Sequence, residues 1–114
     1  MSKRTPLLYL TDILDSVNKI LKYTKGLSFE QFSADELKID AVVRNFQIIG
    51  EAAKNISDKF DDKFPEVSWH EIVGMRNKII HEYSSVDEEI IWKNIKEELP
   101  ILKKQVKKIL DSWS

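Results

Sequence analysis

Apolar residues recur every three or four positions along almost the whole chain, and this spacing constrains the fold more than any other feature. Such a period is typical of helices that pack on one another, whereas a half-buried strand would alternate every two residues. Only three glycines and three prolines interrupt the pattern in 114 residues. The sequence therefore predicts an all-α fold, an antiparallel bundle of four to five helices with short connections.

Start and stop signals place the first two helices. Pro6 is tolerated at a first helical position, and Gly26 suits the end of the helix that follows. A short turn is expected at residues 28–32. Asp35 can then cap a long second helix that runs to about residue 56. Gly50 lies inside that helix, where a glycine costs about 1 kcal/mol relative to alanine. It indicates either the close approach of a neighbouring helix or a tolerated imperfection.

A third helix is expected near the middle of the chain. Ser68 and Glu71 have the S-x-x-E spacing of a capping box, in which each side chain accepts a hydrogen bond from the backbone of the other residue. The apolar period that follows predicts a helix from Trp69 to about His81 or Tyr83.

Two more helices are expected in the C-terminal part. Ser85 and Glu88 repeat the capping-box spacing and predict a fourth helix over residues 87–99. Pro100 should break or restart the chain, because proline lacks the backbone donor of a helix interior. A last amphipathic helix is expected over residues 101–112.

Composition restricts the kind of protein that the chain can be. The 114 residues, 42% of them hydrophobic and 32% charged, predict one compact domain over residues 1–114 with a single core. No cysteine is present, which excludes disulfides and thiolate chemistry. The apolar stretches are too short for a signal peptide or a membrane span. We therefore expect a cytoplasmic location and no association with membranes.

The balance of charge provides no general affinity for polyanions. The 18 Lys and Arg residues against 19 Asp and Glu residues give a net charge of −1, so any contact with nucleic acid must be local. Lys103, Lys104, Lys107 and Lys108 would lie side by side on a helix and are one candidate for such a contact. Lysines in a last turn more commonly offset the helix dipole and keep the outer face hydrated.

The stretch GMRNKIIHEYSS places the residues best suited to catalysis at one helix end. Asn77 and His81 are one turn apart on the same face, and Arg76 lies about 140° around the helix from His81. Histidine can transfer protons near neutral pH, and arginine can donate two hydrogen bonds to a phosphate. Together these residues could cleave a phosphodiester.

Taken alone, each of these residues also has a structural interpretation. A histidine at the end of an amphipathic helix is more often packed or dipole-stabilising than catalytic. Arg76 could only form an ion pair with Glu82 or Glu51. Tyr83 could be a half-buried core aromatic with its hydroxyl at the surface. No acidic cluster or pair of histidines at ligand spacing is present, so neither a metal nor a cofactor is expected.

The motif R-N-x-x-x-H-x-Y resembles that of the HEPN superfamily, in the form found in HepT toxins, where Tyr stands two positions after His. The similarity extends to YLTDILDSVNKILKYTKG, DAVVRNFQIIGEAAKNIS and FPEVSWHEIVG, and so covers nearly the whole chain. An R-x-x-x-x-H match alone is common by chance. Its order with GEAA and PEVSW is much more specific, and it favours a HEPN-like bundle.

This resemblance implies specific roles. Arg76 and His81 would be the catalytic pair of a metal-independent RNase, and Asn77 the polar residue that follows the arginine. Tyr83 would be the acceptor of AMP. HepT toxins are paired with an MntA-type nucleotidyltransferase antitoxin, which silences them by transferring AMP from ATP to that tyrosine. AMP would add an anionic phosphodiester beside Arg76 and block the site.

RNA can be cleaved without a metal when its own 2′-OH attacks the adjacent phosphorus, a step that needs a base and an acid. Each motif supplies one histidine, so we expect a homodimer that brings two copies of His81 and Arg76 together, as the resemblance also implies. The rival hypothesis is an inactive dimeric binding module that scaffolds its nucleotidyltransferase partner. A particular RNA target, such as a tRNA end, stays open beside bulk message.

Overall fold

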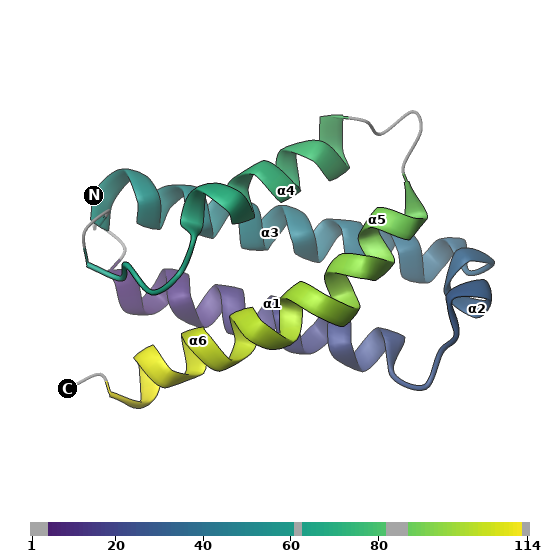
Figure 1. The fold of residues 1–114 in the computed structure, drawn as a ribbon, viewed down its shortest axis with the longest axis horizontal. Coiled ribbons are helices and arrows are strands. Elements are labelled where there is room, and N and C mark those ends of the chain that lie inside the picture. Colours follow the sequence, from purple (N-terminus) through teal and green to yellow (C-terminus); the bar gives the residue numbers. More distant parts are fainter. Residues whose placement is uncertain (1–4, 61–62, 82–86, 113–114) are drawn as a thin grey trace.

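The computed structural model describes residues 5–60, 63–81 and 87–112, with the backbone alone at Ile80 and His81. All regular structure in these ranges is helical, which confirms the all-α prediction (Figure 1). The elements are α1 (Pro6–Thr24), α2 (Phe29–Ser33), α3 (Glu36–Phe60), α4 (Trp69–His81), α5 (Glu88–Lys93), the π-helical segment η2 (Asn94–Glu98) and α6 (Leu99–Asp111).

Helix α3 is the centre of the bundle. It lies between α1 and α4, and the rod formed by α5, η2 and α6 crosses α1 (Figure 1). The core forms where the apolar stripes of these helices meet. Its fully buried members include Leu10, Ile13, Ile20, Phe46, Ile49, Ile56, Ile95 and Leu99. None of the described helices combines the length and the apolarity needed to cross a bilayer.

The predicted limits of α1 and the predicted start of α3 are confirmed, but α3 extends to Phe60, beyond the predicted end near residue 56. Helix α1 starts at Pro6 and ends two residues before Gly26, whose φ of 77° lies in the left-handed region that favours glycine. Asp35 caps α3, because its Oδ1 accepts a hydrogen bond of 3.1 Å from the backbone N–H of Lys38.

The expected turn at residues 28–32 is wrong, because it is largely the short helix α2. Ser28 Oγ accepts from Gln31 N at 3.1 Å, and Gln31 Oε1 accepts from Ser28 N at 2.9 Å, which forms a capping box. Phe32 is fully buried and its ring centroid lies 5.1 Å from that of Trp92. Two local hydrogen bonds and the contacts of two aromatic rings, Phe29 and Phe32, with Trp92 of α5 therefore stabilise a helix too short to form alone.

The N-cap of α5 also differs from the prediction. Helix α5 begins at Glu88, and its N-cap is Asp87, whose Oδ1 accepts from Glu89 N at 3.0 Å and from Ile90 N at 3.2 Å. The predicted cap, Ser85, lies outside the described residues. Aspartate is as strong an N-cap as serine, so the residue adjacent to the helix takes this role.

Of the two outcomes predicted for Pro100, the break is wrong, whereas the α-helix does restart one residue before it, at Leu99. The helical path continues from α5 through η2 into α6, with Pro100 in the first turn of α6. A proline ring inside an α-helix would clash with the carbonyl four residues earlier. The wider π-helical turn just before it, in which Leu99 N–H bonds to Asn94 O, accommodates the ring without ending the helix.

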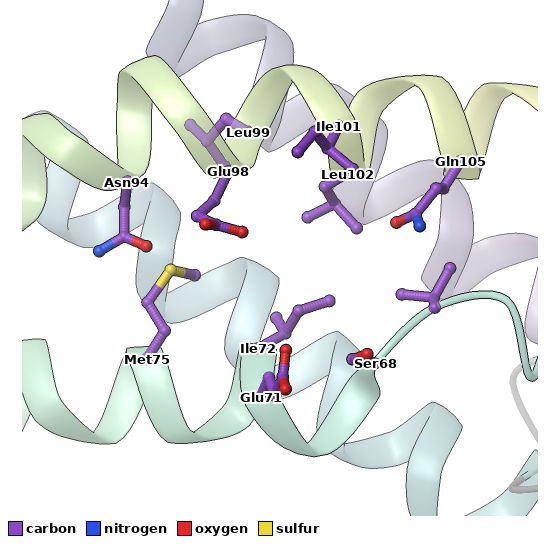
Figure 2. A pocket seen from close by; sticks show the side chains of 11 residues that line it. Ser68, Glu71, Ile72, Met75, Asn94, Glu98, Leu99, Ile101, Leu102 and Gln105 are labelled. Atoms are coloured by element: carbon purple, nitrogen blue, oxygen red, sulfur yellow. The ribbon is translucent and has the colours of Figure 1, made fainter.

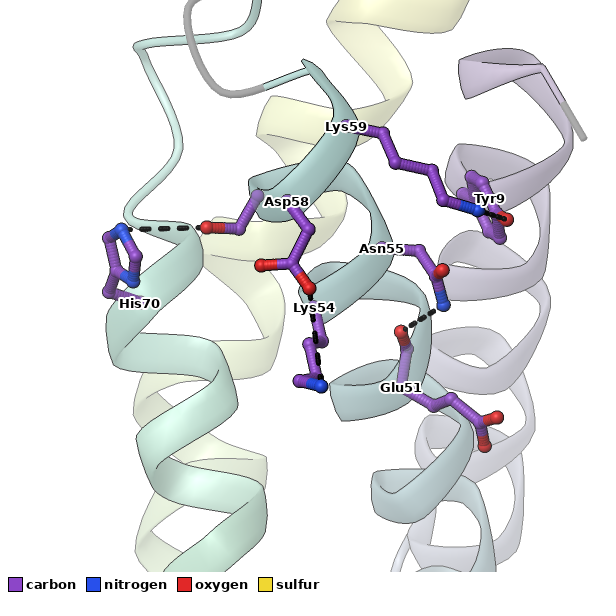
Figure 3. A network of polar contacts seen from close by, with 8 residues as sticks. Tyr9, Glu51, Lys54, Asn55, Asp58, Lys59 and His70 are labelled. Carbon is purple, nitrogen blue, oxygen red and sulfur yellow. Dashed lines mark hydrogen bonds and ion pairs between the residues drawn. The ribbon is translucent and has the colours of Figure 1, made fainter.

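Two polar contacts connect the C-terminal half of α3 to its neighbours (Figure 3). Lys59 Nζ donates to Tyr9 Oη of α1 at 3.3 Å, and Ser57 Oγ lies 3.4 Å from Nε2 of the exposed His70 in α4. The first contact joins α3 to α1 and the second joins α3 to α4, while the packing of α4 on α3 holds the helix that carries the motif.

Candidate active site at the end of α4

Helix α4 presents the motif in its last two turns. Its backbone is α-helical from Trp69 to His81, so Asn77 and His81 occupy one face, one turn apart, and Arg76 projects about 140° away from His81. Asn77 is half-buried. His81 is placed by its backbone alone, and Tyr83 lies outside the described residues. The structure thus locates Arg76 and Asn77 in full.

The Arg76 side chain lies against α3. Its aliphatic atoms pack so closely on Gly50 that a Cβ added to the glycine would overlap Cβ and Cγ of the arginine. Of the two interpretations of Gly50, close approach of a neighbouring helix is therefore confirmed. Because the two residues are far apart in sequence, no local pattern could have linked Gly50 to the site.

The polar end of Arg76 retains an unused donor. Within the part of the chain that the structure describes, the buried Nε has no hydrogen-bond partner. Leaving a buried donor unpaired costs about 1–3 kcal/mol, so an acceptor that reached it would be favoured. Because Nε itself is enclosed by the helix interface, a phosphate would first meet the two Nη groups, which lie in the same plane and donate to phosphate oxygens.

The predicted alternative of an ion pair between Arg76 and Glu51 is not found. The Glu51 side chain points away from α4, and it lines a separate hollow between α1 and α3 (Figure 3). Glu82, the other possible partner, lies outside the described residues. Among the residues that are described, no group of three or more potential metal ligands occurs.

A groove of about 360 Å³ runs along the other side of α4, where that helix faces η2 and α6 (Figure 2). Ile72, Met75 and Leu102 provide its apolar walls, and Glu71 and Glu98 provide its charge. No cation is found among the described residues of the lining. Two carboxylates would repel phosphates, so this groove is not suited to an RNA strand.

The HepT-like family, described as "Ribonuclease HepT-like", matches residues 13–109. The chain belongs to this family. Its HepT-like relatives include "Putative RNase TTE0752" of Caldanaerobacter subterraneus subsp. tengcongensis, which is 48% identical over 94% of this chain and 96% of the relative. "Probable ribonuclease HepT" of Thermococcus cleftensis is 41% identical over 94% of this chain and 97% of the relative. No solved structure matches the chain.

Membership in the HepT-like ribonuclease family confirms the resemblance seen in the sequence and makes RNase the expected class of enzyme. The roles of Arg76, Asn77, His81 and Tyr83 stay predictions. The observation that connects them to chemistry is the unpaired, buried Nε of Arg76 on the helix that also carries His81.

Proposed function

We propose that this HepT-like protein is the toxin of a toxin–antitoxin pair and cleaves RNA without a metal ion. The observation that carries the proposal is the guanidinium of Arg76, held against α3 with a buried Nε that has no partner among the described residues. A phosphodiester would supply acceptors for this group. Family membership supports RNA as the polymer that contains this phosphodiester.

The proposed reaction is a transesterification. One His81 imidazole takes the proton of the RNA 2′-OH, and the 2′-oxygen attacks the adjacent phosphorus. The bond from phosphorus to the 5′-oxygen breaks, and a second imidazole protonates the leaving oxygen. The products are a 2′,3′-cyclic phosphate and a 5′-hydroxyl. Arg76 stabilises the negative charge that develops on the phosphorus oxygens. Asn77 is the polar residue that we place beside the arginine.

The second imidazole does not come from the same chain. The chain has two histidines, and His70 lies at the opposite end of α4, roughly 16 Å along the axis from His81. His70 also faces Ser57 of α3, away from the motif. A homodimer with two-fold symmetry would bring two copies of His81 and Arg76 to one cleft. The site is therefore proposed to be complete only in a dimer.

Tyr83 is proposed as the site of control. An MntA-type nucleotidyltransferase would bind the toxin, and the Tyr83 Oη would attack the α-phosphorus of ATP and displace pyrophosphate. The tyrosyl-AMP carries one negative charge two residues beyond His81, where it can occupy Arg76 in place of RNA. The proposed partners are thus a second copy, the antitoxin and RNA, in the cytoplasm and without a membrane.

Substitution of Tyr83→Phe should abolish this modification, because phenylalanine lacks the nucleophilic oxygen. Protein coproduced with its nucleotidyltransferase is expected to gain the mass of AMP, and the variant none, in an intact-mass measurement. Tyr23→Phe, at a half-buried position of α1, is the matched control and should be modified like the parent. Modification of the Tyr83→Phe protein would show that the acceptor is elsewhere.

The rival function is a binding module that scaffolds the antitoxin without cleaving RNA. The two hypotheses differ when the protein is produced without its partner. A toxin should arrest growth, and Arg76→Ala or His81→Ala should relieve the arrest. A scaffold should be harmless with or without these substitutions, although Tyr83→Phe would still abolish modification. Growth arrest that persists in both variants at equal protein levels would contradict the proposed RNase site.

The RNA target is proposed to be a limited segment, such as a tRNA end. The net charge of −1 provides no general attraction to polyanions, and the groove beside α4 carries carboxylates. Binding therefore depends on a few local contacts around Arg76. General RNA binding would need a broader basic surface.

A further inference from the structure

We infer that Gly50 is a positioning residue of the RNase site: its missing Cβ leaves the space in which the side chain of Arg76 lies. This inference rests on the proposed function, since Arg76 is there the phosphate-binding group. Gly50 itself touches neither substrate nor reacting atoms. It acts through the arginine.

The relation between the two residues is set by the packing of whole helices. Helices α3 and α4 run antiparallel, and Ser57 of α3 faces His70 near the start of α4 at 3.4 Å (Figure 3). About two turns further along, Gly50 faces Arg76. Both contacts belong to one helix interface, so Arg76 cannot move away from Gly50 without shifting α4 on α3.

A Cβ at position 50 would overlap Arg76 in a way that rotation of the arginine side chain cannot relieve. A Cβ at position 50 would overlap Cβ and Cγ of Arg76 and lie 3.1 Å from its Nε. Cβ and Cγ are next to the backbone, so rotation of the guanidinium would not relieve the overlap. Rotation about the first torsion of the arginine would move Cγ but leave Cβ in place, so α4 itself must shift on α3. This shift displaces the Nε that is now buried at the helix interface.

A second glycine provides the contrast. Gly74, in α4, is also inside a helix, but a Cβ added there would have no neighbour within 4 Å. Each glycine carries the same intrinsic penalty relative to alanine. Of these two helical glycines, only Gly50 lies where a neighbouring side chain excludes a Cβ, and that side chain belongs to Arg76.

This arrangement orders the arginine before RNA arrives. The stem of Arg76 lies between two helices, so less side-chain freedom is lost when the guanidinium binds a phosphate. Displacement of a catalytic group by about 1 Å can lower a rate by 10²-fold. We therefore expect Gly50→Ala to lower kcat/KM for RNA cleavage by about 10- to 100-fold, mostly through kcat. Gly74→Ala should stay within about twofold of the parent.

A second measurement does not depend on activity. In the folded protein, the Nε–Hε resonance of Arg76 should shift or broaden in Gly50→Ala and stay unchanged in Gly74→Ala. An unchanged resonance together with parental cleavage by Gly50→Ala would overturn the inference. If Arg76→Ala itself cleaves RNA at the parental rate, the proposed function fails, and the resonance alone then decides whether Gly50 positions the arginine.

A double variant covers the case in which Gly50→Ala does not fold. Gly50→Ala combined with Arg76→Gly removes the overlapping Cβ and Cγ and keeps a glycine at one of the two positions. Recovery of the parental melting temperature to within a few degrees would support the overlap as the cause of the misfolding. Failure of the double variant to fold would overturn the inference.

Discussion

Arg76→Ala is expected to lower the rate of RNA cleavage by about 10²–10³-fold, which corresponds to a loss of roughly 3–4 kcal/mol of transition-state stabilisation. The guanidinium is the group proposed to bind the scissile phosphate, and its Nε has no other partner within the described residues. The removed side chain is only half-buried, so the bundle should remain folded. The rate is measured with purified protein under single-turnover conditions.

The matched control is Arg44→Ala. Arg44 is an exposed arginine of α3 that donates to Gln47 at 3.4 Å and lines the hollow on the α1 side. The Arg44→Ala protein should cleave RNA at the parental rate, although both variants lose one positive charge. Arg76→Lys should recover only part of the activity, because lysine keeps the charge but not the planar pair of donors. Equal losses in the Ala variants of Arg76 and Arg44 would indicate a general charge effect instead.

His81→Ala is expected to lower the same rate by about 10²–10⁴-fold, the usual contribution of a general acid or base. In the proposed dimer one substitution removes both proton carriers. His70→Ala removes the other histidine of the chain, which faces Ser57 at the opposite end of α4, and should cleave normally. The parent should also show a bell-shaped pH dependence, because one imidazole must be neutral and the other protonated. Parental activity in His81→Ala would exclude the mechanism.

Much of the fold could be predicted because the signals are local. The apolar period gives the long helices, and the Asp35 cap depends on a residue three positions away. The errors occur where a distant or competing contact decides. Helix α2 needs the ring of Trp92, and Pro100 is accommodated by the π-helical turn before it. Asp87 caps α5 because it is adjacent to the helix and as effective as serine.

The candidate site, too, could be predicted only where its signals are local. The spacing of Arg76, Asn77 and His81 on one helix follows from the sequence, since the helix itself is strongly signalled. The contact between Arg76 and Gly50 does not, because it depends on how α3 and α4 pack. A glycine inside a long helix indicated close approach of a neighbouring helix, but the sequence did not identify Arg76 as the residue in contact.

The central claim is that two copies of the α4 end cleave RNA through its own 2′-OH. Its most direct test is the mass of the fragments formed when purified protein, treated with a chelator, cuts an RNA oligonucleotide. We predict fragments that end in a 2′,3′-cyclic phosphate and begin with a 5′-hydroxyl. Fragments with 5′-phosphate ends, or cleavage that requires added metal, would contradict it.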